Sequence, residues 1–553
     1  MDERTILVKA LPSTEKCFSD QKIKDKQEQT SFYMLSNQRL TFQIAYSKLT
    51  EDLDAETPAE LVVTSPIKNK ITMYSIEEVP VYKPCYPDSD DGYLRKTPGF
   101  YPDLLMPCSQ WHRVFYHRLR SFFVIIHDNE GIDAGKYPIT FEFYKDGERL
   151  GGTTVTVEII AAMLPEQKLI YTNWFHVDCL AEYYGCEIYS ERHWKIIENF
   201  IKEAVSEGMN MILTPVLTPP LDTGVGWYRA DTGLVHIRKT NEGYDFSYEN
   251  LDRWIDLCTQ CGIRYFEISH LFCQWSAAHA PQVTAEISGK KQKIFGWDTD
   301  ALSSEYTAFI RQFLSDLLLH LQKIGVDNRC FFHIADEPNM QVYDSYTAAK
   351  NSVIDILEGY PVIDALSEYE FYKSGQIRIP IPAITDAEPF LEQDLPMRWT
   401  YYCCGQWKDV SNRFLDMPGQ RTEIIGVQLY KYKIDGFLQW GYNFYNSASS
   451  WHIINPFIDL SGDNWVPAGD TFVVYPAPDG TAYRSLHGMQ FSEGLEDLRL
   501  LEYCEQLIGR DNTMDIVNDG LKNEITFTSY PREADYLIKL KENILHAIEN
   551  AIG

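Results

Sequence analysis

The sequence predicts a multidomain protein of the β plus α/β class, in which an N-terminal β-sandwich precedes a (β/α)8 (TIM-type) barrel and a short C-terminal helical extension. Residues 36–162 contain strand-like runs separated by turns, whereas from residue 168 such runs alternate with amphipathic helical segments. The length of 553 residues suits two or three folded units. The expected parts are the sandwich over 1–163, the barrel over 164–510 and an extension packed on the barrel over 511–553.

The predicted sandwich strands are short runs rich in β-branched and aromatic residues. Such residues suit the pleated, half-buried surface of a strand, and the turn Lys145–Glu148 joins the last two runs. Strands at this spacing with turn residues between them are typical of a β-sandwich. The runs are Arg39–Tyr46, Glu60–Thr64, Ser121–Ile126, Tyr137–Tyr144 and Thr153–Ile160.

Eight strand-like runs follow within the predicted barrel, with helical segments between them. This alternation over some 275 residues is the pattern of a (β/α)8 barrel. The strands are Lys168–Trp174, Asn210–Pro215, Arg264–Ser269, Cys330–Ala335, Pro361–Ala365, Gln376–Pro380, Arg398–Cys403 and Ile434–Gly441. The main helices are His193–Glu207, Leu251–Cys261, Thr307–Lys323 and Gly419–Lys433, and Gly226–Tyr248 is expected to be an inserted hairpin. A last helix is expected over Glu533–Ala551, with one apolar stripe.

Composition and charge exclude several classes of partner. The difference of 50 Lys and Arg against 79 Asp and Glu gives a net charge of −29, which disfavours nucleic acid and anionic membranes. No run of 18 apolar residues predicts a membrane span, and the first residues lack the apolar core of a secretion signal. We therefore expect a cytoplasmic protein, although a secreted chain with its signal removed would have the same pattern.

Cysteine usage and motifs predict no cofactor and no metal site. The 12 cysteines are scattered, and the pair Cys258 and Cys261 has no second Cys or His pair at zinc-site spacing. The sequence contains no GxGxxG after a strand, no P-loop, no HExxH and no GxSxG. Dinucleotide, nucleotide, zinc-protease and serine-hydrolase chemistry therefore lose support, and the pattern assigns no oligomeric state.

Reactive groups in such a barrel come from the carboxyl ends of its strands. The fourth run ends in Asp336, Glu337 and Pro338, which brings two adjacent carboxylates to that rim. In the competing structural interpretation one carboxylate caps the next helix and the other is solvated. His333, inside the same run, is expected to be a core residue. Other polar or aromatic rim groups are His176, Asp222, His270, Tyr401, Tyr402, Trp440 and Asn443, a mixture that suits a neutral sugar.

Several stretches of the chain carry a family resemblance. They are Tyr171–His176, Gly208–Pro215, His333–Pro338, Trp399–Tyr402, Gly436–Asn443, Val474–Gly480 and Phe491–Asp497. Together they resemble glycoside hydrolase family 123 and the uncharacterised C-terminal domain often found with it, over about residues 120–510. The resemblance implies a sandwich and a barrel. It also implies an exo-acting, retaining β-N-acetylgalactosaminidase for glycans or glycosides that contain N-acetylgalactosamine.

The resemblance also implies substrate-assisted catalysis by Asp336 and Glu337. Conventional retaining glycosidases need two carboxyl groups ~5 Å apart across the sugar, which neighbouring residues rarely provide. If the 2-acetamido oxygen attacks instead, Asp336 would hold the acetamido N–H and Glu337 would protonate the leaving oxygen. Either Tyr401 or Tyr402 would hydrogen-bond the acetamide, and Trp440 would form a wall of the pocket.

Two other functions remain open at this point. A conventional retaining glycosidase would use Glu337 as the acid and another rim carboxylate, such as Glu267, as the nucleophile. A barrel that binds sugar without catalysis would keep the aromatic rim and lack turnover. The choice of the galacto over the gluco configuration rests on the resemblance alone.

Overall fold

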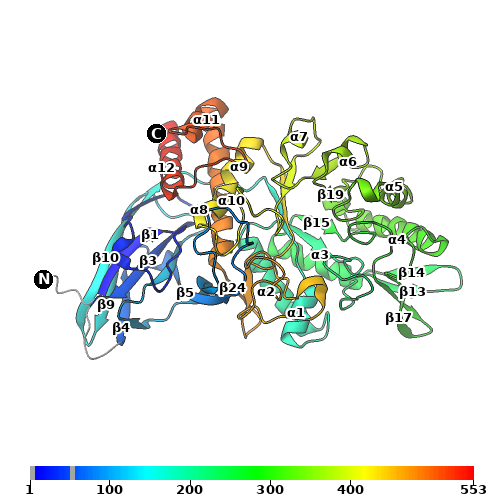
Figure 1. Cartoon of the computed structure of the whole chain (residues 1–553), viewed down its shortest axis with the longest axis horizontal. Helices are drawn as coiled ribbons and strands as arrows, with labels where there is room; N and C mark the ends of the chain where they lie inside the picture. The colour runs from blue at the N-terminus through cyan, green and yellow to red at the C-terminus, as the bar shows by residue number, and fades with distance from the viewer. Residues whose placement is uncertain (1–5, 50–55) are drawn as a thin grey trace.

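The computed structural model describes residues 6–49 and 56–553 of the chain. Figure 1 shows two unequal parts, with a β-rich part formed by the first 160 residues on the left and a mixed part of parallel strands and helices on the right. The prediction that the first residues carry no secretion signal falls partly on residues 1–5, which lie outside the described residues. All twelve cysteines are unpaired.

The β-rich part contains two five-stranded sheets that share one hydrophobic core. Phe42 and Ile44 of the first sheet belong to the same apolar cluster as Phe141 and Val155 of the second. The first sheet has the order β1 (Ile6–Pro12), β3 (Leu40–Lys48), β8 (Arg120–Ile126), β5 (Ile71–Val81) and β6 (Gly99–Pro107). The second has the order β2 (Ser31–Leu35), β10 (Glu148–Ile160), β9 (Gly135–Lys145), β4 (Glu56–Thr64) and β7 (Trp111–Phe115). All five strands predicted here are strands, and the structure adds the other five.

Each of the eight strand runs predicted for the second part contains a strand. Regular ladders join six of them in the order β18 (Cys330–Phe332), β15 (Tyr265–Ile268), β12 (Met211–Thr214), β11 (Ile170–Asn173), β22 (Gly436–Gln439) and β21 (Trp399–Tyr401). The other two, β19 (Ile363–Ala365) and β20 (Ile379–Ile381), form a separate parallel pair. Single parallel bridges, Phe332 to Val362 and Ala383 to Tyr401, connect that pair to the two edges of the larger sheet.

Helices separate these strands and cover the sheet with apolar faces. Ser190 and Ser303 cap two of them, because their hydroxyls accept hydrogen bonds from the backbone N–H groups of His193 and Tyr306. The helices are α1 (Val177–Tyr184), α2 (Glu191–Ser206), α3 (Glu249–Cys261), α4 (Ser304–Lys323), α5 (Tyr343–Asn351), α6 (Tyr369–Lys373), α7 (Glu388–Leu391), α8 (Gly419–Glu423) and α9 (Ile425–Tyr432). Short 3-10 turns occur at Ile23–Asp25, Lys68–Lys70, Asp327–Arg329, Met340–Val342 and Ala448–Ser450. No helix within the described ranges is long and apolar enough to cross a membrane.

The predicted inserted hairpin is present and pairs with a second one. Its strands β13 (His236–Lys239) and β14 (Tyr244–Ser247) join β16 (Val283–Ile287) and β17 (Lys290–Phe295) from the loop after β15. The order of this sheet is β14, β13, β16, β17. Two loops that leave neighbouring strands are therefore tied together at one side of the second part, as Figure 1 shows at lower right.

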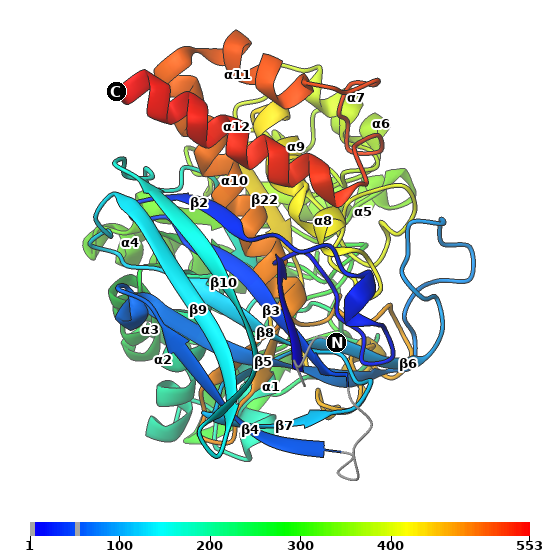
Figure 2. The same cartoon turned by 90° about the vertical axis from the view of Figure 1, so that its left-hand side faces the viewer.

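The C-terminal elements connect the two parts. They are β23 (Val474–Pro476), β24 (Ala482–Arg484), α10 (Leu486–Ile508), α11 (Arg510–Asn518) and α12 (Ala534–Ile552). Helix α10 packs on α8, α9, α12 and strand β6, and Figure 2 shows α12 lying across it. The predicted stripe of α12, Leu537, Leu540, Ile544 and Ile548, is buried. The same helix reaches β2, where the rings of His546 and Tyr33 are 5.2 Å apart.

Candidate active site

Strand β18 delivers Asp336 and Glu337 to the carboxyl end of the parallel sheet. The chain leaves the strand at Phe332, and the backbone oxygen of Asp336 accepts a hydrogen bond of 2.8 Å from the backbone N–H of Trp275. Glu337 has a φ of 46°, in the left-handed region that non-glycine residues rarely adopt. Pro338 follows directly. Such strain persists where the surrounding contacts fix it, and it is concentrated at functional sites.

Tyr401, the last residue of β21, contacts Glu337. Its hydroxyl donates a hydrogen bond of 2.5 Å to Oε1 of Glu337 and lies 3.2 Å from Oγ of Ser367. Tyr402 is buried on the opposite face of the strand, with Phe437 and Phe491 around its ring. Its hydroxyl has no hydrogen-bond partner among the described residues. The structure therefore places Tyr401 in the site and Tyr402 in the core.

Asp336 lies in a cluster of carboxyl groups. Burial, together with the neighbouring charges of Glu337 and Asp222, raises the pKa of Asp336 well above its usual range. Burial also raises the pKa of Asp222 to about 7, with Arg229 acting in the opposite direction. Burial raises the pKa of Asp470 to about 6. A pKa of about 7 leaves Asp222 about half protonated at neutral pH, so the charge of the cluster changes across the neutral range.

Trp440 is bonded to Asp470, whose charge acts on Asp222. The indole Nε1 of Trp440 donates a hydrogen bond of 2.9 Å to Oδ2 of Asp470, and its ring packs on Phe444 and Trp465. Sequence reasoning did not identify Asp470, because it lies at the end of a long loop and 134 residues beyond Asp336. Neither a predicted strand end nor a known motif lies next to this residue in the sequence.

His176 and Asn443 are both buried and are joined to each other by two hydrogen bonds. Asn443 accepts a hydrogen bond of 2.9 Å from the backbone N–H of His176 and donates one of 3.0 Å to its carbonyl. The imidazole lies 3.0 Å from the carbonyl of Trp440 and 3.2 Å from the guanidinium of Arg229. Burial and the Arg229 charge lower the pKa of His176 to about 3. A neutral histidine bonded in this way orients the loop and does not transfer protons at neutral pH.

Arg229, which was not predicted from the sequence, lies beside His176. It pairs with both carboxylate oxygens of Asp178 at 2.7 Å, and both side chains are buried. A bidentate guanidinium–carboxylate pair fixes two loops in one geometry. The ion pair thus holds the loop after β12 against the start of α1, beside His176.

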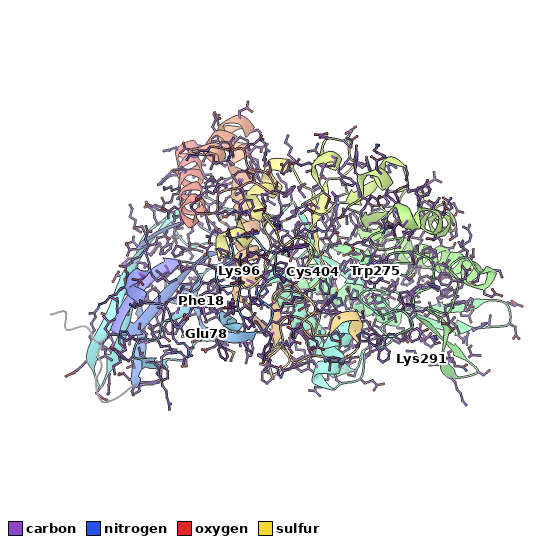
Figure 3. All side chains as sticks on the ribbon, in the orientation of Figure 1. Phe18, Glu78, Lys96, Trp275, Lys291 and Cys404 are labelled. Carbon is purple, nitrogen blue, oxygen red and sulfur yellow. The ribbon has the colours of Figure 1, made fainter. Side chains whose placement is uncertain are left out.

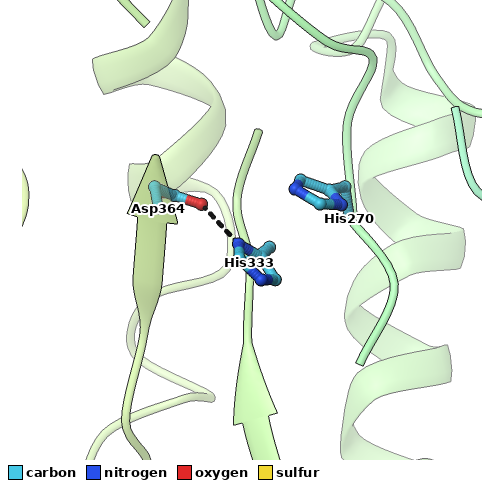
Figure 4. A group of neighbouring side chains, drawn as sticks. All are labelled: His270, His333 and Asp364. Atoms are coloured by element: carbon cyan, nitrogen blue, oxygen red, sulfur yellow. Dashed lines mark hydrogen bonds and ion pairs between the residues drawn. The ribbon is translucent and has the colours of Figure 1, made fainter. Parts of the chain in front are cut away.

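His333 is in the core, as predicted, and lies between two buried carboxylates. Its Nε2 is 2.7 Å from Oε1 of Glu267, and its Nδ1 is 3.3 Å from Oδ1 of Asp364 (Figure 4). Although burial favours the neutral ring, the hydrogen bonds to Asp364 and Glu267 raise the pKa of His333 to about 9. An imidazolium with two carboxylates therefore forms a buried ionic network three residues before Asp336.

His270 stacks on His333, with ring centroids 4.1 Å apart and 20° between the ring planes. Ligand atoms of His270, His333 and Asp364 lie within 4.8 Å of one another, which is a spacing compatible with a metal site. The nitrogen lone pairs of an imidazole lie in the ring plane, so two nearly parallel rings do not direct them at one point. Both nitrogens of His333 are also bonded to carboxylates. The cluster fits an electrostatic role better than metal coordination.

Glu267, the nucleophile considered for a conventional mechanism, is fully buried and its oxygens are occupied. Oε2 accepts a hydrogen bond of 2.6 Å from Thr172, and Oε1 accepts one of 2.8 Å from Trp174 as well as the contact with His333. Three of the roughly four lone-pair sites of this carboxylate are thus used inside the core, and the side chain has no exposed surface. Burial and these contacts count against Glu267 as the nucleophile.

Comparisons with known proteins identify the family. The chain matches the family profile described as the glycoside hydrolase 123 catalytic domain over residues 174–504. No curated protein matches the sequence. Among solved structures, a family 123 glycoside hydrolase from Clostridium perfringens, described for glycolipid glycan hydrolysis, is similar. Its TM-score is 0.73 at 18% identity, over 99% of this chain and 98% of that chain.

Other solved glycosidases are similar only at a low level. A GH5 xyloglucanase from Bacteroides ovatus has a TM-score of 0.29 at 8% identity, over 84% of this chain and 98% of that chain. A β-glucuronidase from Ruminococcus gnavus has a TM-score of 0.30 at 8% identity, over 82% of this chain and 66% of that chain. These scores are too low to support an argument. The family profile, in contrast, covers more than half of the sequence, and the chain therefore belongs to glycoside hydrolase family 123.

Proposed function

We propose that this glycoside hydrolase is an exo-acting, retaining β-N-acetylgalactosaminidase in which the substrate's own 2-acetamido group is the nucleophile. The observation that carries the proposal is the adjacent pair Asp336 and Glu337 at one strand end, with Tyr401 bonded to Glu337. Adjacent residues rarely flank an anomeric carbon at the ~5 Å separation that a protein nucleophile requires. The proposal includes a (β/α)8-type barrel, supported by the two bridges that link β19 and β20 to the larger sheet.

The nearby carboxyl groups also favour substrate assistance over a protein nucleophile. Glu267 is buried and fully bonded. Asp222, with a pKa of about 7, is about half protonated in neutral solution, and its protonated form is a poor nucleophile. Asp470 is fully buried and accepts a hydrogen bond from Trp440, so this carboxyl group is already engaged within the protein.

The reaction balances with these two residues. The acetamido oxygen attacks the anomeric carbon while the bond to the leaving oxygen breaks, and Glu337 gives its proton to that oxygen. Asp336 accepts the acetamido N–H and stabilises the positive oxazolinium ion. Glu337, now a carboxylate, takes a proton from the water that attacks the anomeric carbon from the side of the departed group. The oxazolinium C–O bond breaks, and two inversions give net retention.

The coupled carboxyl groups fit a reaction in which positive charge develops. In the free enzyme the surroundings favour a proton on Asp336. The acid step needs the proton of the pair on Glu337. The developing oxazolinium charge favours the ionised form of Asp336, so the proton that the pair shares passes to Glu337 as the ion forms. An ion pair made only at that stage stabilises the transition state more than the ground state.

The substrate class follows from charge and similarity. The Clostridium perfringens enzyme is described for glycolipid glycan hydrolysis, and a glycan ending in β-N-acetylgalactosamine is the substrate proposed here. The net charge of −29 and the cluster of Asp222, Asp336, Glu337 and Asp470 favour neutral over sulfated or sialylated glycans.

A panel of aryl β-glycosides tests the proposal. The N-acetylgalactosaminide should turn over, the plain galactoside that lacks the acetamide should be inert, and a thiazoline analogue of the intermediate should inhibit tightly. Comparable hydrolysis of the plain galactoside would contradict substrate assistance. Preferred hydrolysis of the N-acetylglucosaminide would contradict the galacto assignment. Binding without turnover of any of these glycosides would support a sugar-binding protein instead.

A further inference from the structure

Three exposed tryptophans surround the end of the sheet that carries Asp336. Their exposed fractions are 41% for Trp227, 49% for Trp275 and 54% for Trp451, in the loops that follow β12, β15 and β22. These strands are parallel, so the three loops leave from one edge of the sheet, together with Asp336 after β18. Among the described tryptophans only one other, Trp111, is exposed to a similar degree, and it lies on β7 in the other part of the molecule.

Trp275 is bound directly to the catalytic strand end. Its backbone N–H donates the hydrogen bond of 2.8 Å to the carbonyl of Asp336, and its φ of 67° turns the chain in a left-handed bend. Figure 3 shows Trp275 near the middle of the mixed part, whereas Lys291 lies at the outer end of the inserted sheet. The backbone of Trp275 is thus joined to that of Asp336, and its side chain is 49% exposed.

Trp227 and Trp451 form a pair whose orientation is fixed by the backbone. Their ring centroids are 5.0 Å apart at an angle of 51°. The indole N–H of Trp227 donates a hydrogen bond of 3.0 Å to the carbonyl of Ser450. Trp451 packs so closely on Gly224 that a Cβ there would meet the ring at 3.2 Å. The polar atom of Trp227 is thus satisfied, while about half of each residue's surface remains exposed.

Hydrogen bonds connect this pair to the carboxyl cluster. Oγ of Ser450 donates one of 2.7 Å to the carbonyl of Asp222, and the backbone N–H of Asp222 donates one of 2.6 Å to Gln274, the neighbour of Trp275. Asp222 in turn interacts electrostatically with both Asp336 and Glu337. Ser450, which accepts the Trp227 hydrogen bond and precedes Trp451, is therefore bonded to the backbone of Asp222, and Trp275 is bonded to the backbone of Asp336.

The backbone at these connections is strained. Left-handed φ values occur at Asp222, Trp275, Glu337, Ser449 and Ser450, all of them non-glycine residues. Exposed aromatic rings and left-handed backbone at non-glycine residues each cost folding stability. Proteins keep such costly features mainly at sites that bind a ligand. The rim as built therefore indicates a binding surface.

We propose that Trp227, Trp275 and Trp451 form a stacking platform for the leaving-group side of the substrate, namely the neutral sugar residue attached to the scissile oxygen and the one beyond it. The proposal rests on the proposed function, because an exo-acting enzyme encloses one sugar and leaves the remaining glycan at the rim. The C–H faces of a neutral sugar suit exposed indoles. The net charge of −29 disfavours anionic sugars and anionic bilayers.

The test compares two substrates in Trp451→Ala and Trp227→Ala. One is an aryl β-N-acetylgalactosaminide, which has no second sugar, and the other is a neutral trisaccharide that ends in β-N-acetylgalactosamine. For each variant, kcat/KM on the trisaccharide should fall on the order of tenfold, mainly through KM, and several-fold less on the aryl glycoside. Trp111→Ala is the matched control and should leave the ratio of the two substrates unchanged. Melting temperatures exclude loss of folding.

Equal losses on both substrates, or no loss on either, would overturn the platform. So would a loss of binding to phosphatidylcholine vesicles in Trp451→Ala without any change on the trisaccharide, since the rim would then contact lipid. If the wild type turns over neither substrate, the proposed function fails by itself. Calorimetry of the trisaccharide with Glu337→Gln still tests the platform: a tenfold weaker Kd on adding Trp451→Ala supports it, and an unchanged Kd overturns it.

Discussion

The hydroxyl of Tyr401 and Oε1 of Glu337 are 2.5 Å apart, joined by a hydrogen bond between the ends of β21 and β18. These strands are the two edges of the six-stranded sheet and are not paired with each other. The bond therefore links the two edges of that sheet at the carboxyl ends of its strands. It fixes the orientation of a carboxyl group whose own backbone is strained.

Loss of this bond should slow catalysis. Tyr401→Phe removes one hydroxyl and leaves the ring, so we expect kcat to fall on the order of 10²-fold, the loss typical of one positioned donor. Tyr402→Phe is the matched control, because the Tyr402 hydroxyl has no partner within the described part of the chain and packs in the core. Steady-state kinetics on one aryl glycoside measures both variants. Equal kcat values in the two would mean that the bond to Glu337 is dispensable.

The two carboxylates should differ in their dependence on the leaving group. Glu337→Gln removes the proton donor, so substrates with poor leaving groups should suffer most and activated aryl groups should be partly spared. Asp336→Asn removes the charge that stabilises the oxazolinium, so kcat should fall on the order of 10²–10³-fold for every leaving group. A plot of kcat against leaving-group pKa with the same slope in both variants would refute this division of labour.

Asp222 should shift the pH profile. Its ionisation, with a pKa of about 7, places a negative charge near Asp336, and a neighbouring like charge raises the pKa of Asp336. Asp222→Asn removes that charge, so the pKa of Asp336 falls. Because the ionised form of Asp336 is the active one in the proposed mechanism, the acid limb of kcat/KM should move to lower pH. Asp146→Asn, in an exposed turn, should leave the limb in place.

Folding stability should fall as the pH rises above neutrality. Burial, with the nearby charge of Glu203, raises the pKa of Glu207 to about 8, and burial with Glu423 raises the pKa of Glu493 to about 7. A carboxyl group whose pKa is higher in the folded state stabilises the fold below its unfolded value of about 4.5, and this contribution is lost as the pH rises through the folded value. The melting temperature should therefore decline between pH 5 and pH 9.

Glu207→Gln isolates one of these contributions. The variant cannot ionise at this position, so its melting temperature should depend less steeply on pH between 6 and 9 than that of the wild type. Glu130→Gln, on an exposed turn, serves as the control and should keep the wild-type slope. An unchanged slope in Glu207→Gln would show that the buried carboxyl does not titrate in that range.

Close packing of two helices should make one glycine irreplaceable. A Cβ at Gly426 of α9 would lie 1.8 Å from the carbonyl oxygen of Gly494 in α10, and both atoms belong to backbones that cannot rotate away. Gly426→Ala should therefore destabilise the protein by several kcal/mol, as overpacked interiors do when the backbone must move. Gly99→Ala, where the nearest atom is 3.9 Å away, should change the free energy of unfolding little. Denaturant titration compares the two variants.

Much of the second part could be predicted because its signals are local. Buried parallel strands are short apolar runs, and all eight predicted runs contain strands. Strand β5 was missed because Glu77, Glu78 and Pro80 interrupt its apolar pattern, and β6 because Pro102 and Asp103 interrupt its own. The local signal fails where a strand pairs at the edge or bulges, as β5 and β6 do between Glu77 and Glu78.

Site residues could be predicted from the sequence only where they directly follow a predicted strand. Asp336 and Glu337 follow a clear strand, so the topology places them. Tyr401 and Tyr402 lie on opposite faces of one strand, and a shift of one residue exchanges them, which the sequence does not settle. Asp470 and Arg229 come from long loops, and only tertiary contacts bring them to the site.

The predicted boundary near residue 163 separates two patterns in the sequence, but buried hydrogen bonds join the two parts across it. Asp103 of β6 is fully buried and accepts a hydrogen bond of 2.5 Å from Tyr475, and it lies 2.7 Å from Nδ1 of His487 in α10. If the second part were excised, both groups would lose their acceptor, and the side of α10 that packs on β6 would be exposed. The β-rich part is thus no detachable accessory module. Recombination that exchanged it for an unrelated binding domain would disrupt the enzyme, so its two parts are expected to evolve together as one inherited unit.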